Sequence, residues 1–178
     1  MTLAEAVRTV PDFPKPGIQF KDITPILADP ALLVRAVDKL VAPFAGQGIT
    51  HVVGIESRGF ILGAMMADRL GAGFVPVRKP GKLPGATARE SYALEYGSDA
   101  LDIHLDAFAA TIDAGEGARV LVHDDVIATG GTAAATARLV ERAGGTLAGF
   151  AFLVELDFLG GRSKLPDGAP VHAILHYD

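Results

Sequence analysis

Residues 120–132, VLVHDDVIATGGT, combine an apolar stretch, two adjacent carboxylates and a glycine-rich turn. The apolar stretch is typical of a buried strand, and the residues after the turn follow a helical pattern. The first N–H groups of a helix have no partner within it and attract anions. Gly130 and Gly131 would let the backbone approach a phosphate. Thr129 and Thr132 would add hydroxyl donors, so the turn predicts a phosphate site.

The two carboxylates before the turn, Asp124 and Asp125, suit a different part of the same ligand. An ionised aspartate only accepts hydrogen bonds, and a ribose offers two adjacent hydroxyl donors. An isolated pair of aspartates at the end of a strand is more often a turn or a helix cap. Beside a phosphate turn, the pair instead indicates a ribose 5-phosphate as the ligand.

Several other kinds of site lack the residues they need. The sequence has no cysteine, and its five histidines show no metal-ligand spacing, which excludes thiolate zinc sites and a cysteine nucleophile. The turn contains no lysine or arginine, so it is not the GxxxxGK[ST] loop of nucleoside triphosphate sites. No GxGxxG fingerprint occurs either, and an NAD site loses its main support.

Arg78, Lys79 and Lys82 place three cations within five positions of a chain whose net charge is -5. They adjoin a polar stretch rich in glycine and proline, residues 80–91, which we expect to form a loop that could close over a substrate. The acidic balance argues against a surface that binds nucleic acid or an anionic membrane. Pyrophosphate is the expected counterpart of this local cluster, and a solvated basic loop is the alternative.

The elements that position these residues alternate along the chain. We expect a short helix within residues 2–10 that Pro11 ends, an ordered arm over 11–23, and a helix that begins at Asp29–Pro30. The later strands and helices predict an α/β fold with right-handed crossovers and a mostly parallel sheet. The expected strands are 50–55, 74–79, 91–97, 119–126, 146–156 and 170–177, and the expected later helices are 60–70, 106–113 and 133–143.

The chain's 178 residues, 49% of them hydrophobic, are enough for one compact domain. The amino terminus lacks the basic start and apolar run of a signal peptide, and no stretch approaches the length of a membrane span. We therefore expect a cytoplasmic protein that acts on small molecules, without nucleic-acid or membrane partners.

Five motifs occur in the order and at the spacing seen in a known family: PDFPKPGIQFKDITPIL, GIESRGF, VRKPGKLPG, SYALEYG and VHDDVIATGGT. The chain resembles the type I phosphoribosyltransferases over nearly its entire length, and these five motifs carry the resemblance. The resemblance implies a mostly parallel twisted sheet flanked by helices, in a single domain over 1–178. It also implies a small N-terminal hood, formed mainly by about residues 1–30, and a mobile loop that covers the reacting centre.

The resemblance assigns roles to the polar motifs. Ala128–Thr132 would hold the 5-phosphate, and the two aspartates would hold the ribose hydroxyls. Residues 56–59 match the family's pyrophosphate loop, which contains Ser57 and Arg58, and a cis peptide is expected between Glu56 and Ser57. Some of the basic residues at 78–82 would reach the neighbouring subunit's site, which implies a homodimer.

For the base, the resemblance places Phe20 of the hood and Leu156 of a late strand on opposite faces of a purine. Backbone groups near Gln19 and Lys21 would read the purine edge. This arrangement favours adenine over a 6-oxopurine, which presents a different pattern of donors and acceptors.

Glu95 resembles the family glutamate that accepts a proton from the purine's imidazole ring, and Tyr96 beside it is carried over as a site residue. With Glu95 and Arg58 as catalytic residues, the implied enzyme transfers the phosphoribosyl group of phosphoribosyl pyrophosphate to adenine. The products would be AMP and pyrophosphate, as in purine salvage. Magnesium is the implied cofactor, held mainly by substrate oxygens and water.

Three alternatives remain open at the level of sequence. The first is a phosphoribosyltransferase for another purine, either xanthine or hypoxanthine and guanine. The second is a regulatory module that binds phosphoribosyl pyrophosphate or a nucleotide without turnover, although the chain has no basic recognition helix. The third is a generic doubly wound nucleotide-binding domain.

Overall fold

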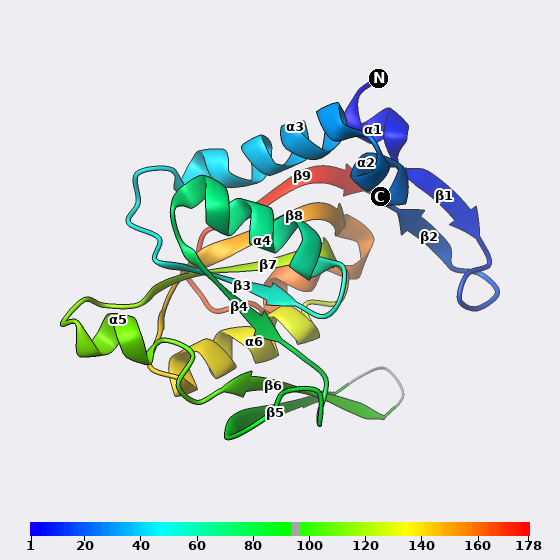
Figure 1. The fold of residues 1–178 in the computed structure, drawn as a ribbon. Helices are drawn as coiled ribbons and strands as arrows, with labels where there is room; N and C mark the ends of the chain where they lie inside the picture. Colours follow the sequence, from blue (N-terminus) through cyan, green and yellow to red (C-terminus); the bar gives the residue numbers. More distant parts are fainter. Residues whose placement is uncertain (94–96) are drawn as a thin grey trace.

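A computed structural model describes residues 1–93 and 97–178 of the chain. Its centre is a five-stranded sheet in the order β4-β3-β7-β8-β9, and every neighbouring pair in it is parallel (Figure 1). This confirms the predicted sheet type. The strands are β3 (His51–Ile55), β4 (Gly73–Val77), β7 (Arg119–Ile127), β8 (Thr146–Leu156) and β9 (Val171–Tyr177).

Helices cover both faces of the sheet, as Figure 1 shows. α3 (Pro30–Val41) and α4 (Gly59–Leu70) pack on one face, and α6 (Gly131–Arg142) packs on the other. Side chains alternate along a strand, so Val120 and Val122 of β7 join the apolar core under α6 while Leu121 joins the core under α3 and α4. A parallel strand buried on both faces in this way is held firmly in place.

The helix predicted to begin at Asp29–Pro30 is confirmed. The Asp29 carboxylate accepts hydrogen bonds from the N–H groups of Ala31 and Leu32, at 2.9 and 3.0 Å. Pro30 occupies the first turn, where no N–H is needed. The predicted helix over 133–143 is also present, but it begins two residues earlier, at Gly131.

The N-terminal region differs from its prediction. α1 (Leu3–Ala6) ends before residue 8, and β1 (Arg8–Pro11) pairs antiparallel with β2 (Gln19–Asp22), followed by α2 (Thr24–Ala28). The predicted helix through residue 10 was wrong because pairing with a distant strand, together with the Arg8–Asp22 ion pair, overrides the local pattern. The β1–β2 hairpin extends from the end of the molecule at which β9 finishes (Figure 1).

A second antiparallel hairpin, β5 (Thr87–Ala93) with β6 (Ser98–His104), lies beside α6. β5 begins within residues 80–91, which we expected to form a polar loop. The reason is burial, since Ala88 packs with Ile103 and the Arg89 guanidinium pairs with the buried Asp102 at 2.7 Å.

The remaining helices are short. They are α5 (Ala109–Asp113), shorter than predicted, and three 3₁₀ turns, η1 (Ala42–Phe44), η2 (Asp157–Leu159) and η3 (Gly161–Lys164).

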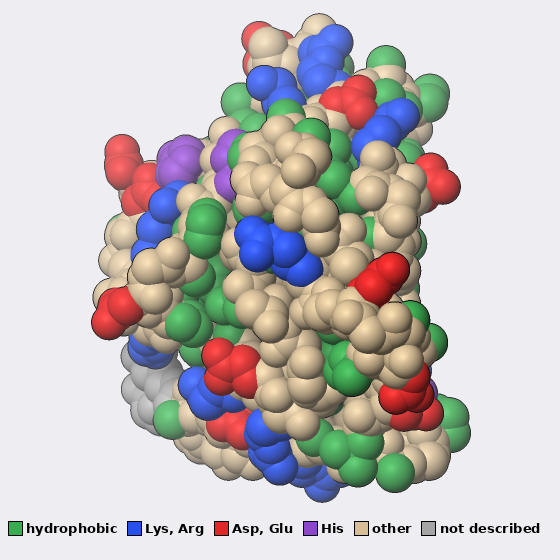
Figure 2. Space-filling model, turned by 90° about the vertical axis from the view of Figure 1, so that its left-hand side faces the viewer, with side chains coloured by type: hydrophobic (Ala, Val, Ile, Leu, Met, Phe, Trp, Pro, Cys, Tyr) green, Lys and Arg blue, Asp and Glu red, His purple; other side chains and the backbone are tan. Residues whose placement is uncertain are grey.

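The face at the opposite end from the β1–β2 hairpin is shown in Figure 2. Basic and acidic side chains are scattered over this face, and neither sign forms a continuous patch there. Across the described residues, no helix is both long enough and apolar enough to span a bilayer.

Candidate active site

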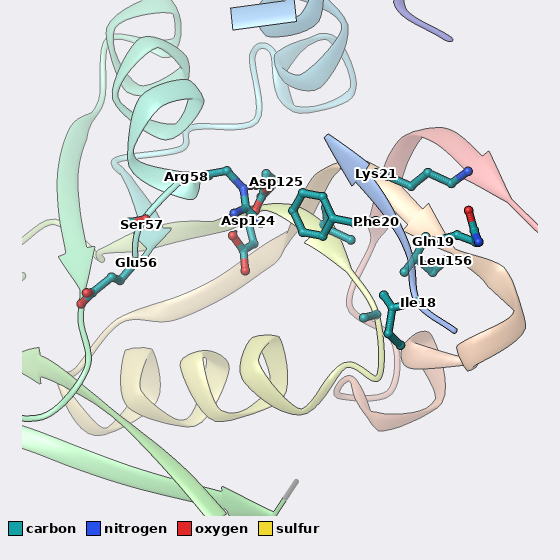
Figure 3. A pocket seen from close by; sticks show the side chains of 12 residues that line it. Ile18, Gln19, Phe20, Lys21, Glu56, Ser57, Arg58, Asp124, Asp125 and Leu156 are labelled. Atoms are coloured by element: carbon teal, nitrogen blue, oxygen red, sulfur yellow. Dashed lines mark hydrogen bonds and ion pairs between the residues drawn. The ribbon is translucent and has the colours of Figure 1, made fainter. Parts of the chain in front are cut away.

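A cavity of about 410 Å³ lies where the carboxyl ends of β3, β7 and β8 meet the β1–β2 hairpin (Figure 3). Ligands of open α/β sheets bind at this edge. The structure therefore brings together the hairpin, the turn after β3, the acidic pair and the end of β8, as the sequence predicts. The lining residues are Ile18, Gln19, Phe20, Lys21, Glu56, Ser57, Arg58, Asp124, Asp125, Val126, Ala128 and Leu156.

The acidic pair lies near the end of β7, inside a strand and not in a turn. Asp125 is only 4% exposed, whereas Asp124 is partly open to the cavity. The Asp125 N–H donates to the Asp124 carboxylate at 2.9 Å. Loss of water around Asp124 and the neighbouring charge of Asp125 raise the pKa of Asp124 well above its ordinary value. The pair thus holds one proton more readily than two separate aspartates would.

Arg58 joins the turn after β3 to the acidic pair. Its Nε donates to Asp125 Oδ2 at 2.5 Å, and its guanidinium carbon lies 5.4 Å from the centre of the Phe20 ring. Although partial burial disfavours the charge on Arg58, the ion pair with Asp125 outweighs this and raises the pKa of Arg58. This ion pair lies at the wall of the cavity, which both residues line.

The turn after β3 has the backbone expected of it. The Glu56–Ser57 peptide is cis, which confirms that expectation. The Glu56 carboxylate accepts hydrogen bonds from the Lys79 N–H at 2.9 Å and from Arg78 Nε at 3.2 Å, and these bonds lower the pKa of Glu56. Glu56 therefore ties this turn to the start of the basic loop.

A second, smaller cavity of about 80 Å³ next to Asp124 is lined by Ala128, Thr129, Gly130 and Thr132 of the turn. Among the described residues, the N–H groups of 129–132 meet no hydrogen-bond acceptor. Gly130 has a φ of +80°, and a Cβ there would overlap the carbonyl oxygen of Gly161. A Cβ on Gly161 would in turn overlap the carbonyl oxygen of Ala128. The turn is thus held open toward the cavity by backbone packed directly on backbone.

Gly161 is a residue that sequence analysis missed. It lies in η3, about thirty positions beyond the turn that it supports. The GG pair at 160–161 is its only local signal, and such pairs ordinarily indicate a surface turn.

The basic residues at 78–82 do not line the main cavity. Lys79 Nζ pairs with Asp99 Oδ2 at 2.6 Å, and Arg78 also donates to the Lys82 carbonyl at 3.3 Å. Lys82 is exposed. The structure therefore places the predicted cations next to the turn after β3 but pairs Lys79 with β6.

Tyr92, another residue that sequence reasoning did not assign, connects this basic segment to the phosphate turn. Its hydroxyl lies 3.4 Å from Asp99 and accepts a hydrogen bond from Thr132 Oγ1 at 3.3 Å. A chain of four side chains, Lys79, Asp99, Tyr92 and Thr132, thus crosses from one region to the other.

Two predicted site residues, Glu95 and Tyr96, lie outside the described residues. Phe20 and Leu156, which the resemblance places on opposite faces of a purine, both line the main cavity.

His123 is fully buried and bonds through Nδ1 to the Ala151 carbonyl at 2.8 Å. Burial lowers the pKa of His123 to about 4, so His123 is a neutral side chain packed within the strand.

Outside the cavity, one cluster among the described residues has the composition of a metal site: Glu155, Asp157 and His176. Its most buried member is already engaged, because the Glu155 carboxylate accepts three hydrogen bonds of 2.6–2.9 Å from Arg162. His176 contacts Asp157 at 3.1 Å, and this hydrogen bond raises the pKa of His176. The cluster is therefore an ion-pair network.

Comparison with known proteins gives consistent results. The family model described as a phosphoribosyl transferase domain matches residues 24–172. An adenine phosphoribosyltransferase of Gloeobacter violaceus is 56% identical over 99% of this chain and 100% of its own length, and one of Myxococcus xanthus is 62% identical over 89% and 83%. The crystal structure of adenine phosphoribosyltransferase from Rhodothermus marinus superposes with a TM-score of 0.90 and 62% identity, covering 98% of this chain and 96% of that one. The Saccharomyces cerevisiae enzyme, solved with adenine and an iminoalditol bisphosphate, gives a TM-score of 0.86 and 45% identity, over 95% and 94%.

Proposed function

The chain belongs to the adenine phosphoribosyltransferase family, and from this premise we infer that it transfers the phosphoribosyl group of phosphoribosyl pyrophosphate to adenine, releasing AMP and pyrophosphate. One observation carries the inference. An acidic pair, with Asp125 buried and Asp124 partly open to a cavity of about 410 Å³, leads into a turn whose N–H groups meet no acceptor among the described residues. A ribose 5-phosphate attached to a flat base has this shape and polarity.

The sugar phosphate occupies the rigid end of the site in this proposal. The N–H groups and hydroxyls of residues 129–132 donate to the 5-phosphate at the start of α6. The oxygens of Asp124 and Asp125 accept from the ribose hydroxyls, and the hydrogen bond from Arg58 Nε holds the Asp125 carboxylate in position for this role.

The base lies between Phe20 and Leu156, which line the cavity from the hairpin and from β8. Backbone groups at Gln19 and Lys21 read its edge, so base selection needs no dedicated amide or carboxylate. Glu95 accepts the proton that the imidazole ring loses as the new bond forms, by the resemblance stated above, and Tyr96 completes that part of the site.

Departure of pyrophosphate leaves positive charge on the sugar, as in glycosyl transfers with an oxocarbenium-like transition state. Arg58 donates to Asp125 through Nε alone. The other N–H groups of its guanidinium can therefore donate to the leaving pyrophosphate and neutralise its charge. Ser57 contributes its backbone N–H to the pyrophosphate site. The adjoining segment contributes the positive charges of Arg78, Lys79 and Lys82. Lys79 must leave Asp99 to take part, which requires a movement of this segment.

Magnesium fits the donors present. Asp124 and Asp125 offer the hard oxygens that this ion prefers, but Asp125 is also bound to Arg58. We therefore propose that the ion is held mainly by substrate oxygens and water, near these carboxylates, and that it helps to neutralise the charge of the pyrophosphate.

We also propose a homodimer in which the exposed Lys82 reaches the partner's site. We propose a cytoplasmic location as well, because the charged substrate does not cross membranes and is available there.

The test is to mix the protein with phosphoribosyl pyrophosphate and magnesium, and to offer adenine, hypoxanthine, guanine and xanthine in turn. We expect AMP from adenine and little product from the other bases. A product from another base would reassign the specificity. Binding of phosphoribosyl pyrophosphate without any product would favour a sensor and overturn the proposal.

A further inference from the structure

Two adjacent residues of the β1–β2 hairpin, Phe20 and Lys21, point to opposite sides of β2 (Figure 3). Phe20 faces the guanidinium of Arg58 at 5.4 Å. The Lys21 ammonium lies 4.2 Å from the centre of the Tyr177 ring and donates to Thr9 Oγ1 across the hairpin at 3.0 Å. The hairpin is therefore held to the body of the molecule by a cation over an aromatic ring on each side.

Tyr177 connects this contact to the other wall of the base site. It lies in β9 and is paired with Leu156 of β8. Paired residues of neighbouring parallel strands point to the same face of a sheet, and both side chains pack on the apolar core under α3 and α4. The path from Phe20 through Lys21 and Tyr177 to Leu156 thus links the two residues proposed to enclose the purine.

The hairpin needs such an attachment. No residue of β1 or β2 is fully buried, and a two-stranded hairpin is at best marginally stable alone. α1 and α2 anchor its two ends through Leu3 and Ile26, and the Thr24 N–H of α2 donates to Asp22 of β2 at 2.9 Å. These anchors lie at the end of the hairpin away from its turn, whereas Phe20 lies nearer the turn. The contacts on either side of β2 therefore supplement these anchors at Phe20.

We propose that Lys21 and Tyr177 are positioning residues that hold Phe20 at its distance from Leu156 and so set the affinity for the purine. This inference rests on the proposed function, because it assumes that adenine lies between those two side chains. Neither Lys21 Nζ nor the Tyr177 ring needs to contact the substrate. The contact acts by keeping the hairpin closed against β9.

The experiment compares two variants that remove the contact with two that keep it. Lys21→Met removes the charge and keeps the length of the chain, and Tyr177→Leu removes the aromatic face and keeps apolar bulk. Lys21→Arg and Tyr177→Phe preserve a cation and a ring. Lys39→Met removes an exposed lysine from α3 and is the matched control.

We expect Lys21→Met and Tyr177→Leu each to raise KM for adenine about 3- to 30-fold, the range of a cation–π contact, with KM for phosphoribosyl pyrophosphate unchanged within about twofold. Each conservative variant should recover most of the affinity for adenine that its disruptive counterpart loses, and the control Lys39→Met should stay at the wild-type KM. The double variant should be no worse than the more affected single variant, because both changes remove the same contact.

Three results would overturn the proposal: an unchanged KM for adenine in Lys21→Met, an equal rise in KM for both substrates, or additive effects in the double variant. If Tyr177→Leu fails to fold, Lys21→Met and Lys21→Arg still decide the matter, since Lys21 lies on the hairpin. AMP formation by the wild-type protein is measured first. Its absence would refute the proposed function itself, whereas AMP formation with an unaltered adenine KM would refute only the role of these residues.

Discussion

The turn after β7, residues 128–132, and the hairpin that carries Phe20 border two adjoining cavities, but they are held in different ways. The turn continues a strand buried on both faces, and Gly130 and Gly161 fix it by backbone contact. The hairpin has no fully buried strand residue and depends on contacts made by the ends of long side chains. In the proposed function, the sugar phosphate would thus meet a preformed site, while the base would meet walls that must be brought together.

The largest expected effect tests which residue accepts the proton from the base. Glu95→Gln should lower kcat by about two to four powers of ten with little change in affinity for phosphoribosyl pyrophosphate, because it removes a general base but leaves the phosphate turn intact. Steady-state kinetics for both substrates would measure this. Glu116→Gln, at an exposed position, is the control. An unchanged kcat would remove Glu95 from the mechanism and leave the catalytic base unassigned.

The next effect tests the rigid side. A Cβ at Gly161 has no room, so Gly161→Ala should displace the phosphate turn and lower kcat/KM for phosphoribosyl pyrophosphate by about 100-fold, the cost of a misplacement of roughly 1 Å. KM for adenine should change much less. Gly117→Ala, where nothing lies within 4 Å of an added Cβ, should behave as wild type. If adenine affinity fell as strongly as that of phosphoribosyl pyrophosphate, the two sides of the cavity would not be independent.

A smaller effect concerns stability and pH. Because the pKa of Asp124 is raised above the ordinary value of 3.8, the folded protein binds more protons than the unfolded chain between those two values. Its free energy of unfolding therefore falls as pH rises through that window. Asp124→Asn removes this loss and should therefore stabilise the protein near pH 8, with a smaller gain near pH 5.

Urea denaturation of Asp124→Asn at the two pH values would measure the difference, and the exposed Asp167→Asn is the control. A destabilised Asp124→Asn at both values would show that the carboxylate is favoured in the folded state. The gain in stability should accompany a loss of activity, since sites built to bind a ligand often keep groups that do not favour folding.

Sequence predicted the rigid side of the site well because its chemistry is contiguous. Asp124, Asp125 and the turn occupy one stretch, and an apolar strand followed by a glycine turn and a helix has one common arrangement. It failed where a role depends on residues far apart in the chain. Gly161 beneath the turn and Tyr177 beneath Lys21 carry no local pattern that indicates a site, and Arg8–Pro11 became a strand only because β2 pairs with it.

The smallest effect tests the link between the turn at residues 128–132 and the basic segment at residues 78–82. Tyr92→Phe removes the hydroxyl that lies between Thr132 and Asp99 but keeps the ring that packs against Gly131. If the turn is rigid by itself, KM for phosphoribosyl pyrophosphate should rise no more than about threefold, the worth of one neutral hydrogen bond of modest geometry. Asp99→Asn should then have a similar effect, because it weakens the same chain at the Lys79 end. A rise above tenfold in both variants would mean that Thr132 responds to the state of Lys79, so that closure of the basic segment and occupation of the phosphate turn are one event.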